Sequence, residues 1–323
     1  MNGKQAPFYS YAVMCTRENA MKPEKVHDKE GKARIRKGSK EAKKPLRSDE
    51  SPDLSSFTNQ IICGDASAVL SRIPEKSIDM IVTSPPYNFG HSYAQDPHDD
   101  THEWNVYFKN LLAVWRECER VLKPGGRIAV NVQPLFSDYI PTHHIISRQL
   151  ADLGLLWKAE FLWEKNNYNA KYTAWGSWKS PSMPYIKYTW EFIEVFAKES
   201  HKKTGRREDI DITGDEFKDW VVGKWSFPPE IRMKDYDHPA MFPEELPRRL
   251  MKLFSYKNDI VLDPFNGAGT SSLVAWKLGR RFIGVDVSHR YCETALARIR
   301  KTAAGAIPPT GYPDPGIIVM DDT

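Results

Sequence analysis

The chain has 323 residues, of which 41% are hydrophobic and 27% are charged, as in globular proteins that bury a core. Its net charge of +4 is small, and no apolar run reaches the roughly 18–20 residues that a membrane-spanning helix needs. Its four cysteines lack the paired spacing of a zinc or disulfide framework, so we expect no membrane contact, no metal site and reduced thiols.

The positive charge is concentrated near the N-terminus. Between Lys22 and Glu50 there are eleven Lys or Arg residues and six Asp or Glu residues, with few apolar ones. Such a segment cannot bury enough apolar surface to fold alone, so residues 1–56 are expected to form a disordered basic arm. The arm could serve solubility, or it could hold phosphate groups.

From about Asn59 onward, strand and helix patterns alternate along the chain. The expected strands are 61–63, 78–82, 127–132, 157–163, 190–197, 259–262 and 282–285. The expected helices are 66–73, 104–122, 142–153, 243–254, 271–278 and 288–300. This alternation predicts an α/β fold with a doubly wound, mostly parallel sheet over residues 57–303, in which 190–197 is the antiparallel partner of 157–163. The polar stretch 198–237 carries no predicted element, and residues 304–323 are expected to be an irregular tail.

A glycine-containing turn follows the strand that ends near Leu262. It reads Asp263-Pro264-Phe265-Asn266-Gly267-Ala268-Gly269-Thr270, and such turns let the backbone approach a ligand at the carboxyl edge of a sheet. Asp286 closes the next strand, where an acidic side chain can bind ribose hydroxyls. The same pattern occurs in ordinary βαβ units, but turn and acid together favour a nucleoside ligand.

A second motif, Ser84-Pro85-Pro86-Tyr87, follows the strand 78–82 directly. Two consecutive prolines fix the backbone and remove two donors, which leaves carbonyl oxygens as fixed acceptors beside a hydroxyl and an aromatic ring. Such a group suits a planar substrate that carries an NH₂ group. Alone, it could equally be a rigid turn with a surface tyrosine.

Together the two motifs resemble those of the DNA amino-methyltransferases, which pair a (D/N/S)PP(Y/F/W) motif with DPF-x-G-x-G-T. The resemblance covers roughly residues 60–300 and includes Gly64-Asp65, the segment 122–126 and the segment 238–243. The catalytic motif precedes the cofactor motif, as in the circularly permuted β-type members of that family. The resemblance therefore implies a circularly permuted fold of the S-adenosylmethionine-dependent methyltransferase type, with a small target-recognition insertion.

The resemblance also implies a site and a cofactor, S-adenosyl-L-methionine. Asp286 would bind the ribose hydroxyls, Asp65 would lie near the adenine edge, and the turn would line the methionine end. The implied cofactor-binding residues are Asp65, His238, Phe242, Asp263, Pro264, Phe265, Gly267, Gly269, Thr270 and Asp286. The implied catalytic residues, which would hold the target base, are Ser84, Pro85, Pro86 and Tyr87.

In the family, serine at the position of Ser84 usually accompanies methylation of cytosine N4, and aspartate that of adenine N6. We therefore expect methyl transfer to cytosine N4 in duplex DNA, by base flipping and direct in-line transfer. An N6-adenine enzyme is the alternative, a non-catalytic cofactor- or DNA-binding module is more remote, and motif order disfavours RNA or protein amides. Expected partners are double-stranded DNA and a cognate restriction endonuclease. The enzyme would be a monomer or homodimer, cytoplasmic and nucleoid-associated in a prokaryote or nuclear in a eukaryote.

Target-recognition elements are expected within residues 166–225. Aromatic and cationic residues alternate between Asn166 and Tyr188, which suits nucleic acid but could also shape the base pocket. The candidate DNA-binding residues are Lys179, Lys187, Arg206 and Arg207. The stretch that holds the two arginines could instead be a solvated charged loop.

Overall fold

The computed structural model describes residues 53–86, 103–134, 139–166, 176–184, 186, 188–231, 233–236, 241–303 and 315–320. Nearly all of the expected N-terminal arm therefore lies outside the described residues. Within them, no helix is long and apolar enough to cross a membrane.

The described strands form one nine-stranded sheet in the order β6-β4-β5-β3-β2-β7-β8-β1-β9. The strands are β1 (Gln60–Cys63), β2 (Ile78–Thr83), β3 (Leu122–Val132), β4 (Leu156–Glu164), β5 (Trp190–Ala197), β6 (Lys224–Ser226), β7 (Ile260–Asp263), β8 (Arg281–Asp286) and β9 (Gly316–Val319). All neighbouring strands pair in parallel except where β5 lies antiparallel to β3 and β4. This sheet confirms the predicted α/β class, and the β4–β5 pairing confirms the predicted antiparallel partners.

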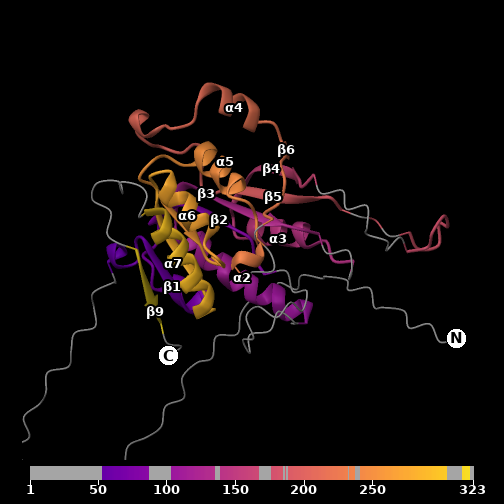
Figure 1. The fold of residues 1–323 in the computed structure, drawn as a ribbon, viewed down its shortest axis with the longest axis horizontal. Coiled ribbons are helices and arrows are strands. Elements are labelled where there is room, and N and C mark those ends of the chain that lie inside the picture. The colour runs from indigo at the N-terminus through magenta and orange to yellow at the C-terminus, as the bar shows by residue number, and fades with distance from the viewer. Residues whose placement is uncertain are drawn as a thin grey trace, which may run out of the picture. The chain divides into compact units, whose positions relative to one another are not determined.

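Helices cover both faces of the sheet. They are α1 (Ala66–Ser71), α2 (Trp104–Val121), α3 (Thr142–Asp152), α4 (Gly214–Trp220), α5 (Glu245–Phe254), α6 (Thr270–Lys277) and α7 (His289–Ala303), with short 3₁₀ turns at Leu54–Ser56, Arg207–Asp209 and Met233–Tyr236. Apolar side chains of α1, α2 and α3 pack on one face, and those of α4 to α7 on the other. Figure 1 shows α5, α6 and α7, coloured orange to yellow, side by side over the sheet.

Two parts of the chain differ from the sequence-based expectation. The tail expected to be irregular contains β9, which extends the sheet by pairing in parallel with β1. Three of its four residues, Ile317, Ile318 and Val319, are β-branched, but the neighbouring Pro and Gly residues obscure this short run. The polar stretch 198–237 contains α4 and β6, whose Trp220 and Trp225 are buried among the apolar side chains under α5. Each element buries essentially one side chain, so neither produces a recognisable period.

The order of the strands reverses between β2 and β7. From β2 the sheet continues to β3, whereas from β7 it continues in the opposite direction to β8 and β1. In open α/β sheets, ligands bind outside the carboxyl ends of the strands at such a switch point. Both motifs found in the sequence follow these two strands, since Ser84 follows β2 and Pro264 follows β7.

A carboxyl group is buried on the strand next to β3. Glu194 is 1% exposed, Ser147 Oγ donates to its Oε2 at 3.3 Å, and Glu160 lies opposite it on β4. Burial and, secondly, the nearby Glu160 charge raise the pKa of Glu194 to about 8. The native state therefore holds a proton that the unfolded chain has lost, in the window from the ordinary glutamate pKa of 4.5 up to about 8.

Because the folded-state pKa is raised, the stability from this group is fully present at low pH and is lost as pH rises through about 8. We expect the stability advantage of Glu194→Gln over the wild type to be about 1–3 kcal/mol larger at pH 8.5 than at pH 6, since each of the roughly two pH units between pH 6 and the raised pKa corresponds to about 1.4 kcal/mol. Urea unfolding at both pH values measures it, and equal pH dependence of the two proteins would contradict the assignment.

Candidate active site

A buried hydrogen bond joins the two strand ends at the switch point. Thr83 Oγ1, the last residue of β2, donates to Oδ1 of Asp263, the last residue of β7, at 2.6 Å. The same Oδ1 accepts the N–H of Phe265 at 3.1 Å, and Asp263 is 2% exposed. Burial raises the pKa of Asp263 to about 6, although the Thr83 hydrogen bond favours the ionised form. The carboxylate thus fixes the turn after β7 against the end of β2.

The segment Ser84-Pro85-Pro86 leaves β2 directly beside that bond. Ser84 and Pro86 are half-buried and Pro85 is buried. Tyr107 Oη on α2 donates to the Pro86 carbonyl at 2.6 Å. The sequence predicted unpaired carbonyl oxygens in this segment, and for Pro86 that prediction is wrong. The Pro86 oxygen is paired with Tyr107 and anchors the segment to α2, so it is not kept free for a substrate. Tyr87 lies outside the described residues.

The turn after β7 is held by the next strand. The N–H of Gly267 donates to Asp286 Oδ2 at 2.7 Å, and the N–H of Ser288 donates to Oδ1 at 2.9 Å. These two bonds fix the Asp286 carboxylate at the end of β8, half-buried and beside the turn. A carboxylate in this position can accept hydrogen bonds from ligand hydroxyls, as expected from the sequence.

Two glycines are required by close packing around this turn. Gly269 has φ of +78°, and a Cβ there would lie 2.6 Å from the Ala295 Cβ of α7. A Cβ on Gly284 of β8 would lie 2.6 Å from Cγ of Asn266. Asn266 needs that space because its Oδ1 accepts the Ser272 hydroxyl at 2.6 Å, which ties the turn to α6. The turn and the helix can thus approach β8 closely.

Asp65 lies at the end of the strand beside β8. It caps α1, accepting the Ala68 N–H at 2.9 Å, and its side chain is exposed. The N–H of Gly64 donates to the Asp286 carbonyl at 3.0 Å, so Asp65, just after β1, and Asp286, at the end of β8, lie at the same edge of the sheet. The structure therefore brings Asp65, Asp286 and the glycine turn together.

Arg298 supports the turn from α7, and the sequence patterns did not reveal it. It is 9% exposed, donates to the Ala268 carbonyl, and lies 3.2 Å from Thr270 Oγ1. Its guanidinium carbon is 4.3 Å from the centre of the Tyr236 ring. Thr270 is therefore buried, and its hydroxyl contacts the arginine that holds the turn. The available signal was an arginine on the otherwise apolar face of a helix that carries Ala295 and Ile299.

The remaining expected cofactor residues contribute apolar surface. Pro264 is buried, and the Phe265 ring contacts the Trp115 ring edge-on at 5.9 Å. Phe242 packs against the apolar cluster that includes α5 to α7. His238 lies outside the described residues. A carboxylate for ribose hydroxyls, a close backbone turn and flanking aromatic rings at one edge fit a nucleoside-containing cofactor.

The candidate DNA-binding residues lie at opposite edges of the sheet. Lys179 is exposed in the segment 176–184, which follows the carboxyl end of β4, and its Nζ is 5.5 Å from the centre of the exposed Trp178 ring. Arg206 pairs with Asp209 at 2.8 Å, and the Asp209 carbonyl accepts the Lys257 N–H just before β7 begins. Arg206 and its neighbour Arg207 are therefore not brought to the edge that holds the motifs. Lys187 lies outside the described residues.

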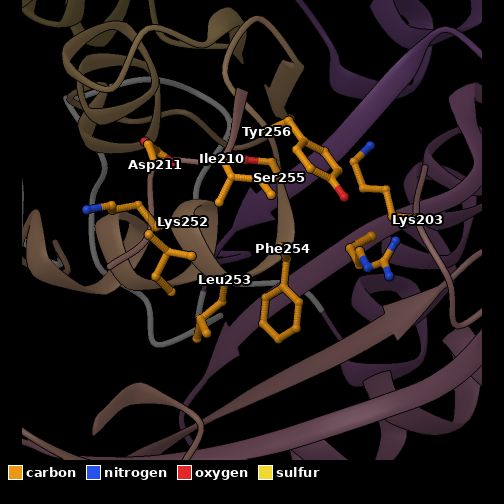
Figure 2. A pocket seen from close by; sticks show the side chains of 10 residues that line it. Lys203, Ile210, Asp211, Lys252, Leu253, Phe254, Ser255 and Tyr256 are labelled. Carbon is orange, nitrogen blue, oxygen red and sulfur yellow. The ribbon is translucent and has the colours of Figure 1, made fainter. Parts of the chain in front are cut away.

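A cavity of about 250 Å³ lies at this opposite edge, and neither motif lines it. Figure 2 shows Lys203 and Tyr256 on one side of the cavity and Asp211 and Lys252 on the other. Both lysines of the lining form ion pairs within the protein, since Lys203 lies 3.1 Å from Asp79 and Lys252 lies 2.6 Å from Glu216. Their charges are thus already compensated.

Comparison with known proteins shows the family to which the chain belongs. Residues 78–297 match the N6/N4 methyltransferase family, described as DNA methylase. Type II methyltransferase M.MjaVI of Methanocaldococcus jannaschii is 38% identical over 170 residues, 51% of this chain and 85% of that protein. DNA adenine methyltransferase YhdJ of Escherichia coli K12 is 32% identical over 254 residues, 74% of this chain and 82% of that protein.

A solved structure adds the cofactor. TTHA0409 of Thermus thermophilus, a proposed DNA modification methylase, was crystallised in complex with S-adenosyl-L-methionine. It is 27% identical, covers 82% of this chain and 99% of its own, and superposes with a TM-score of 0.62. The chain belongs to the N6/N4 DNA methylase family and is an S-adenosylmethionine-dependent DNA methyltransferase.

Proposed function

We propose that the chain methylates the N4 amino group of cytosine in duplex DNA. The observation that carries the proposal is the position of Ser84, whose hydroxyl lies at the carboxyl end of β2. The hydrogen bond between Thr83 and Asp263 holds this end of β2 beside the glycine turn after β7. The serine favours cytosine on the family preference stated above. Duplex DNA would be bound with the target base flipped out, at a cost of a few kcal/mol.

The chemistry requires activation of a weak nucleophile. The lone pair of an exocyclic amine is delocalised into the base ring, so hydrogen bonds from both N–H groups must favour a tetrahedral nitrogen. Ser84 Oγ and the Pro85 carbonyl are the proposed acceptors, because the Pro86 carbonyl is engaged by Tyr107. The segment would act by position and electrostatics, without a covalent enzyme intermediate.

The cofactor-binding residues have separate tasks in this proposal. S-adenosyl-L-methionine supplies an electrophilic methyl group when it is bound. Asp286, held by Gly267 and Ser288, would bind the ribose hydroxyls, and Asp65 would lie near the adenine edge. Thr270 and Asp263 are buried beneath the turn, so they would fix the orientation of the turn and would make little direct contact with the ligand.

DNA would be held at the carboxyl edge of the sheet. The exposed Trp178 and Lys179 after β4 offer a ring for stacking and a cation for phosphate, with Lys187 beyond them in the chain. Tyr87 would stack on the flipped base, at about 1–3 kcal/mol per stacked base. Contacts by Arg206 and Arg207 stay a prediction, and they would need DNA to reach the opposite edge.

An adenine-N6 enzyme is the second candidate, because the relative from E. coli is named a DNA adenine methyltransferase. Methylated DNA should therefore be digested to nucleosides and analysed by mass spectrometry. We expect N4-methylcytosine; N6-methyladenine as the only product would overturn the choice of base. A chain that left DNA unmethylated would instead favour a non-catalytic module.

The Tyr107 hydrogen bond to Pro86 gives a second prediction. Tyr107→Phe removes one neutral hydrogen bond, worth about 0.5–1.5 kcal/mol, and loosens the segment that carries Ser84. We expect the single-turnover methylation rate to fall about 3- to 10-fold, with unchanged affinity for S-adenosyl-L-methionine. The matched control is Tyr256→Phe, which removes a hydroxyl at the opposite edge of the sheet and should not change the rate. Equal rates for Tyr107→Phe and wild type would refute the anchoring role.

A further inference from the structure

A buried polar side chain lies beside Ser84 on the neighbouring strand. The register of β2 and β3 pairs Val82 with Ala129 and ends by pairing Thr83 with Val130. On β3 the next residue is Asn131, and Ser84 follows directly after the end of β2. Val82 and Ala129 belong to the same buried cluster, so alternation along β3 assigns Asn131 to that face, and Ser84 stands two residues after Val82. Neighbouring strands lie about 4.8 Å apart, so one hydrogen bond can span the two side chains.

The amide of Asn131 is held in one orientation. Its side chain is 2% exposed, and its Nδ2 donates to Glu191 Oε2 at 2.5 Å. Its Oδ1 is buried and has no hydrogen-bond partner among the described residues. A buried acceptor left without a donor is costly, so such an atom in a ligand-binding region indicates a donor that turns toward it when the complex forms.

Glu191 is itself fixed by a cation. Lys165 Nζ forms an ion pair with Glu191 Oε1, and the side chains are 19% and 5% exposed. Lys165 Nζ also lies 5.6 Å from the centre of the Trp163 ring, and the backbone N–H of Lys165 donates to the Thr189 carbonyl at 3.0 Å. Because Lys165 can only donate, the carboxylate stays an acceptor for Asn131 Nδ2, and Oδ1 must face away from Glu191.

A serine in a methyl-transfer site needs such a partner. A hydroxyl is both a donor and an acceptor, whereas an ionised carboxylate only accepts. To accept a hydrogen bond from the target amine with good geometry, Ser84 must direct its own proton elsewhere. Otherwise the hydroxyl proton and an amine proton would compete for the same space.

We propose that, in the complex with DNA, the Ser84 hydroxyl donates to Asn131 Oδ1 and so presents its lone pairs to the target amine. Asn131 is a positioning residue, oriented by Glu191 and Lys165. No covalent bond is made or broken in this step, because the proton stays on Ser84 Oγ. The inference rests on the proposed function of Ser84 as the acceptor for the amine.

A double-mutant cycle tests the proposal. Single-turnover methyl incorporation into duplex DNA, from labelled S-adenosyl-L-methionine, is compared for wild type, Asn131→Leu, Ser84→Ala and the double variant. Asn131→Leu should lower the rate about tenfold or more in the wild-type background and less than about twofold in the Ser84→Ala background. Affinity for S-adenosyl-L-methionine should be unchanged. An equal fold loss in both backgrounds, or no loss in either, would overturn the proposal.

Two further variants keep the test decisive. Ile193→Val shortens the buried residue paired with Asn131 across β3 and β5, so it controls for loss of packing and should leave the rate unchanged. If Ser84→Ala is too slow to measure, Ser84→Asp replaces it, because a carboxylate has no hydroxyl proton to direct. Asn131→Leu should then cause no loss, and a tenfold loss would refute the role of Asn131.

The outcomes separate the two proposals. If the wild type fails to methylate DNA, or if Ser84→Ala is as fast as wild type, the proposed function of Ser84 fails and the inference fails with it. If Ser84→Ala is slow and the cycle is additive, only the role of Asn131 fails.

Discussion

The hydrogen bond between Thr83 and Asp263 is the contact on which the site depends. It is buried, it measures 2.6 Å, and it joins strands that are 180 residues apart in sequence but adjacent in the sheet. Since the strand order reverses there, the bond lies at the point of the carboxyl edge where open α/β sheets bind their ligands. The serine-proline segment begins on one side of the bond and the glycine turn begins on the other, so the bond fixes the starts of the two segments relative to each other.

Each half of the site is then fixed by its own supports. On the side proposed to bind the cofactor, Asp286 accepts the Gly267 N–H, while Arg298 donates to the Ala268 carbonyl beneath the turn. On the side proposed to bind the target base, Tyr107 of α2 donates to the Pro86 carbonyl. Most of these supports act on backbone atoms, which suits a reaction in which alignment provides much of the catalysis. Helices on both sides of the sheet, α2 and α7, therefore hold the segment 84–86 and the turn after β7.

Local pattern was enough to predict most of the fold and the two motifs. The parallel sheet, the β4–β5 pair, and the juxtaposition of the glycine turn with Asp286 follow from alternation and from the carboxyl-edge rule. The supports Tyr107, Arg298 and Asn131 escaped prediction, because their partners are distant in sequence and each looks like an ordinary residue of its helix or strand. Arg206 and Arg207 show a different limit, since charge alone does not reveal the edge of the sheet on which a loop lies. The strands β6 and β9 are too short to show a period.

The most direct test of the role of this bond is the methyl-transfer rate of Thr83→Val at saturating DNA and S-adenosyl-L-methionine. The substitution keeps the shape of the side chain but removes the donor to Asp263. Because a misplacement of about 1 Å can cost about 10²-fold in rate, we predict a loss of at least about tenfold in a variant that still folds cooperatively. A folded Thr83→Val protein with the wild-type rate and cofactor affinity would contradict the central role of the bond.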